Sequence, residues 1–393
     1  MIILELLIVA WMASGCIYWL VVLWLTVRIV RTVPLMEKLP EPRREEWPEV
    51  SVIVPLRDEA ENVKGPVAGR LAEEYPEVEF VLVDDRSTDG TGGLIDSLAA
   101  SDARVRAVHV KELPGGWIGK AYAMQRGLEE SGGGWLAFSD ADVDVKSGTL
   151  EKAVSYCESE GLDFLAVIPG LNRGKSLMDS VSQVLLRVML ITERVWKVDD
   201  DESGAAVGSP SLALVRRAVL EEAGGLAELR MEPSEDVALA QMVKASGGRC
   251  GILNGRGYVG ASFPPRLREM ALDSERAIYA SLGGFSLARI FWLTLLFFVL
   301  EFGPYLFFFP FGIPYHDLIG TAAVSVGIVV SIIICRWTGL PLLAAFYFPI
   351  DLFIVVYIML RAGIVGTAQG GLWWQGDFYP AEMLSMGRKF RYR

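Results

Sequence analysis

A long apolar stretch near the beginning of the chain constrains its fold more than any other feature. Residues 2–27 read IILELLIVAWMASGCIYWLVVLWLTV, which exceeds the roughly 20 apolar residues that a helix needs to cross a bilayer. No basic segment precedes the stretch and no small-residue cleavage site follows it, so we expect an uncleaved anchor over residues 1–30. The basic residues that follow predict a cytoplasmic location for the next domain. They are Arg28, Arg31, Lys38, Arg43 and Arg44.

Apolar sequence returns in three blocks, 289–313, 318–335 and 340–360. Three complete spans would place the aromatic and basic tail, 362–393, outside the cell, whereas its basic residues favour the cytoplasm. We therefore expect a broken or re-entrant segment within 284–361, and internal prolines make the first and third blocks the candidates. These prolines are Pro304, Pro310 and Pro349, and the basic residues are Arg361, Arg388, Lys389, Arg391 and Arg393.

The composition indicates that a soluble domain shares the chain with these segments. The 393 residues are 52% hydrophobic and 22% charged, a mixture that suits a multi-pass protein of the plasma membrane with one soluble domain. A linker, 31–47, leads to this domain, 48–283. The net charge of −11 argues against nucleic acid as a partner. Four scattered cysteines and two histidines predict neither a disulfide framework nor a histidine-based triad.

Apolar runs alternate with helical patterns in the soluble domain. This order predicts an α/β fold in which a doubly wound, mainly parallel sheet is covered by helices on both faces. The expected strands are 50–55, 79–84, 104–110, 134–140 and 163–169. Polar clusters follow three of them, at 57–62, 84–91 and 140–144. Ligands of such sheets bind at the carboxyl ends of the strands, so we expect the clusters to form one site.

The run WLAFSDADVDV carries Asp140, Asp142 and Asp144 after a predicted strand. A calcium loop could use these positions together with Glu151, but Val145 stands where the loop requires glycine. An Asp-x-Asp pair at a strand end can instead hold a divalent ion that grips a diphosphate. Solvated loop carboxylates are the remaining alternative.

Two further motifs have polar chemistry. VDDRSTDGT places Asp84 and Asp85 where they can accept hydrogen bonds from a base or ribose. GGWIGKAYAMQRG lacks the residues of a phosphate-binding P-loop, because Pro114 and Ala121 occupy two defining positions. Lys120 opens a predicted helix there, which suits phosphate oxygens, although a helix cap with a surface lysine would look the same.

Acidic residues also begin the predicted helix in SEDVALAQMV. Glu235 and Asp236 fall in its first turn, where the helix dipole favours negative charge without any further role. The segment 176–197 has a wide apolar stripe, which predicts either a helix on the membrane surface or a core helix.

Five motifs, in this order and spacing, resemble the membrane-attached inverting glycosyltransferases of family 2. They are SVIVPLRDEAENV, VDDRSTDGT, PGGWIGKAYAMQRG, FSDADVDV and SEDVALA. The relatives that they resemble include the hopanoid-associated and carotenoid glycosyltransferases and the ceramide glucosyltransferases. The resemblance implies a GT-A fold over 48–283, a nucleotide-sugar donor such as a UDP-hexose, and Mg²⁺ or Mn²⁺ held by Asp140 and Asp142. It also implies donor contacts from Pro55, Arg57, Glu59, Asp84, Asp85, Lys120, Asp140 and Ala141.

The same resemblance implies the catalytic roles. Asp236, with Glu235 beside it, would remove a proton from the acceptor, a hydroxyl of a lipid in the bilayer. Of the family's Gln-x-x-Arg-Trp motif only Arg276 remains, which disfavours a polysaccharide synthase, and Glu-Asp disfavours a polyprenyl-phosphate acceptor. The segment WWQGDFYP resembles an aromatic segment of these relatives, so Trp373 and Trp374 are predicted acceptor contacts. A scaffold with a degenerate sugar site is the alternative from another class.

Overall fold

Parallel strands covered by helices form one part of this chain, and long apolar helices form the other. The computed structural model describes residues 2–42, 46–172, 174, 176–310 and 315–389. Contacts divide the chain into two units. The sheet unit comprises Val33–Asn172, Glu193–Ser262 and Trp373–Arg393. The helical unit comprises Met1–Thr32, Arg173–Thr192 and Phe263–Leu372. Arg43, Arg44, Arg391 and Arg393 lie outside the described residues.

A seven-stranded sheet in the order β3-β2-β1-β4-β8-β6-β9 forms the centre of the sheet unit. Only β8 among these strands runs antiparallel to its neighbours. The strands are β1 (Val50–Leu56), β2 (Val78–Asp85), β3 (Val105–Val110), β4 (Trp135–Phe138), β6 (Phe164–Ile168), β8 (Ala213–Arg216) and β9 (Cys250–Asn254). The five expected strands are confirmed as β1, β2, β3, β4 and β6, while β8 and β9 were not expected.

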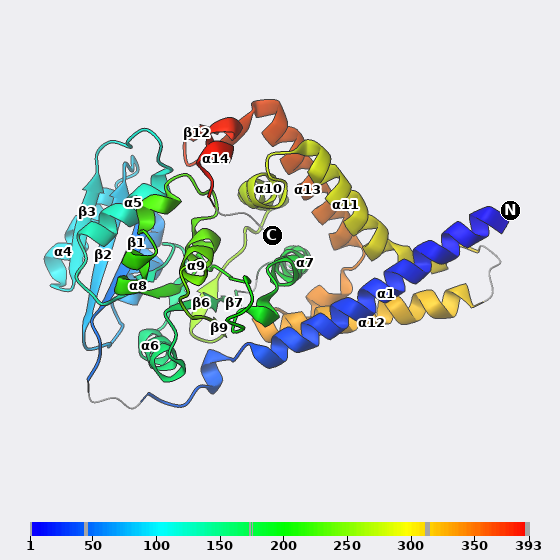
Figure 1. The fold of residues 1–393 in the computed structure, drawn as a ribbon, viewed down its shortest axis with the longest axis horizontal. Coiled ribbons are helices and arrows are strands. Elements are labelled where there is room, and N and C mark those ends of the chain that lie inside the picture. Colours follow the sequence, from blue (N-terminus) through cyan, green and yellow to red (C-terminus); the bar gives the residue numbers. More distant parts are fainter. Residues whose placement is uncertain (1, 43–45, 173, 175, 311–314, 390–393) are drawn as a thin grey trace. The chain divides into compact units, whose positions relative to one another are not determined.

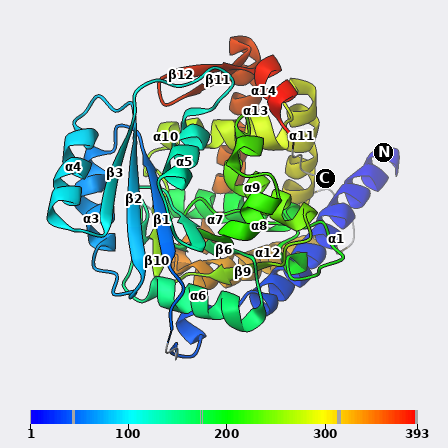
Figure 2. The ribbon, with the colours of Figure 1, turned by 60° about the vertical axis from the view of Figure 1, so that its left-hand side comes forward.

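Helices cover both faces of this sheet because successive side chains of a strand point to opposite faces. Val52 and Leu82 face the core cluster that includes Ile95 of α4. Ile53 and Val83 face the other way, where Gly127 allows α5 to approach them closely. Figure 2 shows α4 and α5 on opposite sides of the strands. The helices of this unit are α2 (Ala60–Asn62), α3 (Ala68–Arg70), α4 (Thr91–Ser101), α5 (Gly119–Glu129), α6 (Thr149–Glu160), α8 (Arg217–Glu222), α9 (Glu235–Ala245) and α14 (Ala381–Gly387).

Two small sheets complete the strands. One joins β5 (Asp144–Val145), β10 (Val259–Ala261) and β7 (Gly170–Leu171). The other is the hairpin of β11 (Gly371–Trp374) and β12 (Asp377–Pro380). Gln375 and Gly376 connect its strands with φ angles of 47° and 84°. Positive φ at both central residues defines the type I′ turn, whose twist matches that of the flanking strands.

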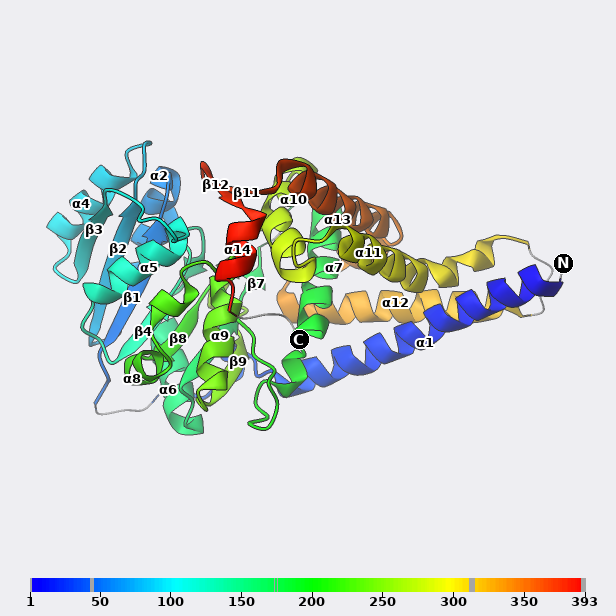
Figure 3. The same ribbon diagram turned by 45° about the horizontal axis from the view of Figure 1, so that its top comes forward.

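The helical unit contains the apolar segments (Figure 1). Its helices are α1 (Ile2–Thr32), α7 (Ser176–Thr192), α10 (Leu267–Arg276), α11 (Leu287–Phe302), α12 (His316–Thr338) and α13 (Ile350–Gln369). Four stretches among the described residues are long and apolar enough to cross a membrane, and Figure 3 shows α1 and α12 as the longest helices. They are Ile3–Thr32, Leu287–Phe308, His316–Thr338 and Ile350–Gln369.

Two of the prolines in the apolar blocks lie next to the ends of helices. Pro304 lies in a 3₁₀ turn, Gly303–Phe308, that follows α11, and Pro349 directly precedes α13. The helical part of the third block therefore starts at Ile350 and continues to Gln369, beyond the predicted end at 360. On which side of the membrane the tail lies stays a prediction at this point.

The boundaries of the units differ from the predicted domain boundaries. Segment 263–283 was expected in the catalytic domain but belongs to the helical unit, because α10 packs against α13 and Glu275 pairs with Arg361 at 2.6 Å. Helix α7 belongs to the same unit, and its polar side chains Ser180 and Gln183 are buried rather than exposed. The tail from Trp373 onward belongs to the sheet unit.

A buried ion pair links helices of the helical unit. Arg187 of α7 contacts Glu301 of α11 at 2.9 Å, and the side chains are 2% and 0% exposed. The Tyr18 hydroxyl donates a hydrogen bond to Glu301, and the Arg187 guanidinium lies 4.7 Å from the centre of the Trp19 ring. Since an unpaired buried charge is strongly unfavourable, each member of this pair depends on the other.

We expect Arg187→Met alone to lower stability by about 3–5 kcal/mol, because it leaves Glu301 buried without its cation. Adding Glu301→Gln should recover much of this loss. Melting temperatures in one detergent, with Arg289→Met as an exposed control, test both statements. A single variant as stable as its double counterpart would contradict the paired role.

Candidate active site

Three polar clusters meet at one edge of the central sheet. β1 pairs in parallel with both β2 and β4, so the carboxyl ends of these strands are neighbours. Arg57 follows β1, Asp85 ends β2, and Asp140 follows β4 by two residues. The predicted convergence of the clusters is therefore confirmed as a matter of placement.

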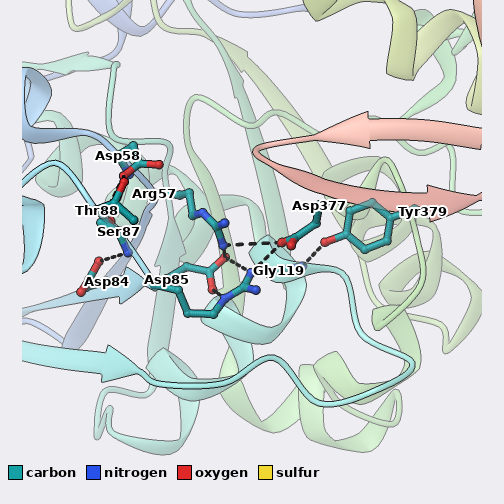
Figure 4. Close-up of polar contacts among 10 residues, drawn as sticks. Arg57, Asp58, Asp84, Asp85, Ser87, Thr88, Gly119, Asp377 and Tyr379 are labelled. Atoms are coloured by element: carbon teal, nitrogen blue, oxygen red, sulfur yellow. Dashed lines mark hydrogen bonds and ion pairs between the residues drawn. The ribbon is translucent and has the colours of Figure 1, made fainter.

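Two arginines surround Asp85 in the first part of this site (Figure 4). Arg86 Nε donates to Asp85 Oδ1 at 2.8 Å, and Arg57 Nη1 lies 3.7 Å from Asp85 Oδ2. Asp85 is only 4% exposed, so these cations compensate a nearly buried carboxylate. The carboxylates of Asp85 and Asp377 raise the pKa of Arg86 despite its partial burial, so this cation stays protonated.

The neighbouring Asp84 faces the other way. Its Oδ1 accepts from the Ser87 amide at 3.1 Å, and its Oδ2 lies 3.2 Å from His109 Nδ1 on β3. A hydrogen bond that His109 donates to Asp96 raises the pKa of His109; burial opposes this shift, and Asp84 adds to it. These contacts give Asp84 a part in shaping the loop after β2.

The loop after β1 is tied to the loop after β2. Asp58 adopts φ = 54°, a conformation that Asp and Asn tolerate, and its Oδ1 accepts from the Thr88 amide at 2.6 Å. The Glu59 amide donates to Thr91 Oγ1 at 2.9 Å. Burial raises the pKa of Glu59, its hydrogen bond with Asn62 lowers it, and the charges of the nearby acidic loop raise it further.

Gly119 begins α5 at a point where only glycine fits. A β-carbon there would lie 2.5 Å from Asp85 Oδ2 and 3.0 Å from Arg86 Nη2. Its amide donates to the Tyr379 hydroxyl at 3.1 Å (Figure 4). The absence of a side chain thus lets α5 approach the Asp85 cluster.

Lys120, the next residue of α5, bridges two carboxylates. Its Nζ lies 2.6 Å from Asp140 Oδ1 and 2.6 Å from Glu235 Oε1. The lysine was expected at a helix start, and it lies in the first turn of α5, in contact with the acidic loop and α9; its role toward phosphate stays a prediction. A pocket is lined by side chains of this region, including Pro55, Lys120, Asp140, Ser209, Pro210, Glu235 and Asp236.

Arg70 holds the acidic loop, residues 140–144, through its backbone carbonyl groups. No role was predicted for Arg70 from the sequence. Arg70 is 3% exposed, and its Nη2 donates to the carbonyl oxygens of Asp140 and, at 2.7 Å, Val143. Burial lowers the pKa of Arg70 to about 10, against the opposing effect of the nearby aspartates. A lone arginine in a short helix gives no signal in sequence, because the carbonyl groups that it binds lie 70 residues away.

The carboxylates of this loop suit a divalent cation. Partial desolvation and the negative charge of Asp140 raise the pKa of Asp142. The Asp142 residue is nevertheless exposed to solvent. Asp144 begins β5 and accepts a hydrogen bond from Asn172 at 3.1 Å. No group of three His, Cys, Asp or Glu side chains among the described residues could hold a metal ion by itself. Two carboxylates match the usual share of protein ligands for Mg²⁺, which takes the rest from water and phosphate.

Asp236 lies in the first turn of α9, as predicted. Gly208 permits this placement, since a β-carbon at Gly208 would lie 2.2 Å from the Asp236 carbonyl carbon. Ala141 is buried between the two metal-binding candidates. The site thus brings together the predicted residues of the sheet unit from Pro55 to Asp236.

Three predicted residues lie elsewhere in the chain. Arg276 ends α10 in the helical unit. Trp373 and Trp374 lie on β11, where Trp373 is 63% exposed and packs against Phe378 with ring centres 5.3 Å apart. Their roles toward an acceptor stay predictions. The structure adds Arg86, Asp377 and Tyr379, which stand inside quoted motifs but were not assigned a role.

Residues 51–224 match the sequence profile of the family described as Glycosyl transferase family 2. These residues form a family 2 glycosyltransferase domain. The site described above begins within this glycosyltransferase domain, and Glu235 and Asp236 follow its matched segment.

Relatives of known name agree with this family. The chain is 33% identical over 109 residues to a putative teichuronic acid biosynthesis glycosyltransferase of Bacillus subtilis, covering 28% of this chain and 42% of the relative. It is 23% identical over 153 residues to the 4,4'-diaponeurosporenoate glycosyltransferase of Staphylococcus aureus, covering 39% and 40%. The chain thus spans less than half the length of either relative.

The likeness of the glycosyltransferase domain extends to its fold. A mannosyltransferase from Pyrobaculum calidifontis, solved with GDP-Man and Mn²⁺, superposes with a TM-score of 0.55 at 18% identity. The match covers 93% of this chain and 99% of that one. The central sheet is therefore of the GT-A type, as the resemblance implied.

We expect Gly119→Ala to lower stability by about 1–3 kcal/mol, because the new methyl group displaces a nearly buried carboxylate from its partners. Gly115→Ala in the same loop is the matched control, since a β-carbon there meets nothing within 4 Å. Melting temperatures of both variants decide the matter. Equal values for the two would show that the contact with Asp85 is not tight.

Proposed function

We propose that this protein is an inverting glycosyltransferase that moves a sugar from a nucleotide-diphosphate sugar to a hydroxyl group of a membrane lipid. The proposal is supported above all by the order of groups along one sheet edge. Asp85 and Arg57 lie at one end, Lys120 and the acidic loop follow, and Asp236 lines the same pocket as Lys120. This order suits a nucleoside, a diphosphate and a reacting sugar in succession.

The nucleoside would occupy the Asp85 end. Asp85 keeps free lone pairs on both oxygens after pairing with Arg86, so it can accept from a base or ribose. Arg57 Nε and Nη1 are shielded from solvent and make no hydrogen bond within the described residues. A buried N–H group that lacks a hydrogen-bond acceptor costs about 1–3 kcal/mol. An oxygen atom of the nucleotide sugar would be a fitting acceptor for these groups.

The diphosphate would lie at the acidic loop. Asp140 and Asp142 would hold a divalent ion, Mg²⁺ or Mn²⁺, which supplies positive charge to the leaving diphosphate. Lys120 adds a second cation from the first turn of α5, where backbone amides also favour anions. The mannosyltransferase of similar fold was solved with GDP-Man and Mn²⁺, which supports the metal and the donor class.

Asp236 is the proposed general base. It lines the pocket that contains Lys120 and Asp140, and its backbone is fixed by the close approach of Gly208. Glu235 beside it is 2% exposed and bound to Lys120, so it orients the lysine and is poorly placed to accept a proton itself. A positioned carboxylate can take the proton of an acceptor hydroxyl as this attacks the sugar.

A lipid acceptor in the cytoplasmic leaflet agrees with the helical unit. Four stretches of the described chain could cross a membrane, and a soluble acceptor would not require them. Basic residues that follow the first stretch favour a cytoplasmic catalytic domain. The similar Staphylococcus aureus protein is named a 4,4'-diaponeurosporenoate glycosyltransferase, which supports an acceptor that is not a sugar.

Asp142→Asn should abolish sugar transfer and weaken nucleotide binding in the presence of Mn²⁺, because a neutral amide holds a hard cation poorly. Asp144→Asn in the same loop is the matched control and should keep most of its activity. Release of nucleoside diphosphate in nanodiscs with a lipid extract measures both. Full activity of the wild type in excess EDTA would refute the metal.

Asp236→Asn should bind nucleotide with nearly normal affinity and lose a factor on the order of 10² to 10⁴ in turnover. Glu235→Gln provides the contrast. It removes the carboxylate that orients Lys120, so it should weaken nucleotide binding. Nucleotide affinity, melting temperature and turnover are measured on one preparation of each. If Asp236 only favours the helix dipole, its amide costs at most about 1 kcal/mol of stability and turnover stays above a tenth of normal.

A further inference from the structure

The C-terminal hairpin brings a carboxylate to the arginines of the proposed donor site. Asp377 Oδ2 lies 2.9 Å from Arg86 Nη2 and 3.5 Å from Arg57 Nη1 (Figure 4). The turn at Gln375 and Gly376 directly precedes Asp377 and sets its position at the start of β12. Nearly 300 residues of chain separate this carboxylate from Arg86, so the contact is a feature of the fold and not of local sequence.

The four charged groups form a balanced cluster. Two guanidinium groups face two carboxylates, and both arginines contact Asp85 as well as Asp377. Without Asp377, one carboxylate would have to hold two cations that repel one another. Asp377 thus allows Arg57 and Arg86 to lie together over Asp85, with side chains only 15% and 19% exposed.

A second contact comes from the same strand. The Tyr379 hydroxyl accepts a hydrogen bond from the Gly119 amide at 3.1 Å, directly before Lys120. Tyr379 is 6% exposed, and burial together with the charge of Asp377 raises its pKa, while the bond from Gly119 lowers it. β12 therefore contacts both the nucleoside end and the helix that carries Lys120.

We infer that the hairpin 371–380 completes the donor site, and that Asp377 is a positioning residue that orients Arg57 and Arg86 for a nucleoside diphosphate. The inference rests on the proposed function and adds Asp377 and Tyr379 of the hairpin to the residues of its donor site. Arg57 Nη1 lies 3.5 Å from Asp377 Oδ2 and makes no hydrogen bond within the described residues, so its direction depends on Asp377. Loss of Asp377 therefore loosens nucleotide binding.

An opposite effect has to be weighed. Removing one carboxylate leaves the cluster with a net positive charge, which attracts the anionic donor. This attraction has no preferred direction, whereas lost orientation weakens hydrogen bonds whose strength falls steeply with distance and angle. We therefore expect the lost orientation of the arginines to outweigh the added positive charge. Weaker nucleotide binding indicates the first effect, and tighter binding indicates the second.

Other contacts hold the tail when Asp377 is changed. Arg388 Nε lies 3.6 Å from Glu232 Oε2, the Lys389 amide donates to Glu232 Oε1 at 2.5 Å, and Lys389 also pairs with Glu228. Leu384 of α14 is 1% exposed. A variant at Asp377 should therefore keep its fold and its docked tail.

The experiment measures the affinity of the full chain in nanodiscs for UDP and for GDP, each with Mn²⁺, by calorimetry. Asp377→Asn should raise the Kd of the nucleotide that the wild type prefers about tenfold, the size of one charge-assisted contact of about 1.4 kcal/mol. Asp377→Glu should restore at least half of this loss on a logarithmic scale. Glu382→Gln, which removes an exposed charge from the same tail, is the matched control and should change nothing.

Coupling between nucleotide binding and docking of the hairpin gives a second measurement, which would not change if Asp377 had only a structural role. If the hairpin completes the site, nucleotide binding must stabilise its docked state, so amide exchange of residues 371–380 should slow when nucleotide is added to the wild type. In Asp377→Asn this added protection should shrink. Unchanged affinity of Asp377→Asn, or tighter binding, would overturn the inference while leaving the proposed function in place. A wild type that binds neither nucleotide would overturn both.

Discussion

The ammonium group of Lys120 connects the elements on which the site depends. It lies between Asp140, delivered by β4, and Glu235, delivered by α9, and it is itself carried by α5. This cation offsets the cost of burying Glu235, which is 2% exposed. Three segments that are distant in sequence are thus held at one point by electrostatics, and the neighbouring glycine, Gly119, brings the Asp85 cluster against the same helix.

Much of the sheet could be predicted from sequence because buried parallel strands are short apolar runs with polar residues at their carboxyl ends. VSVIVP and EFVLVD show this pattern clearly, and they became β1 and β2. β8 was not predicted, and its antiparallel direction shows only in its pairing with β4 and β6, not in its own side chains. The assignment of α10 to the helical unit was not predicted, because its packing against α13 leaves no signal in the local sequence.

The candidate site shows the same limit at the level of side chains. Asp85, Lys120, Asp140 and Asp236 stand in motifs for which the family resemblance implies a role. Arg70 acts by binding carbonyl oxygens of a remote loop, and Asp377 by pairing with residues near the opposite end of the chain. Such roles depend on tertiary contacts, so single residue identities cannot reveal them. In WWQGDFYP the tryptophans are the predicted acceptor contacts, whereas the contacts to Arg86 and Gly119 come from Asp377 and Tyr379 of the same segment.

The ion pairs of Asp377 also bear on how the chain threads a bilayer. Asp377 can pair with Arg57 and Arg86 only if tail and catalytic domain share one compartment. A chain that leaves a compartment and returns to it makes an even number of passages. Between Ser262 and Trp373, however, three helical stretches are long and apolar enough for a passage. The docked hairpin thus favours an even number of passages, which agrees with the prediction that one of these stretches is broken or re-entrant.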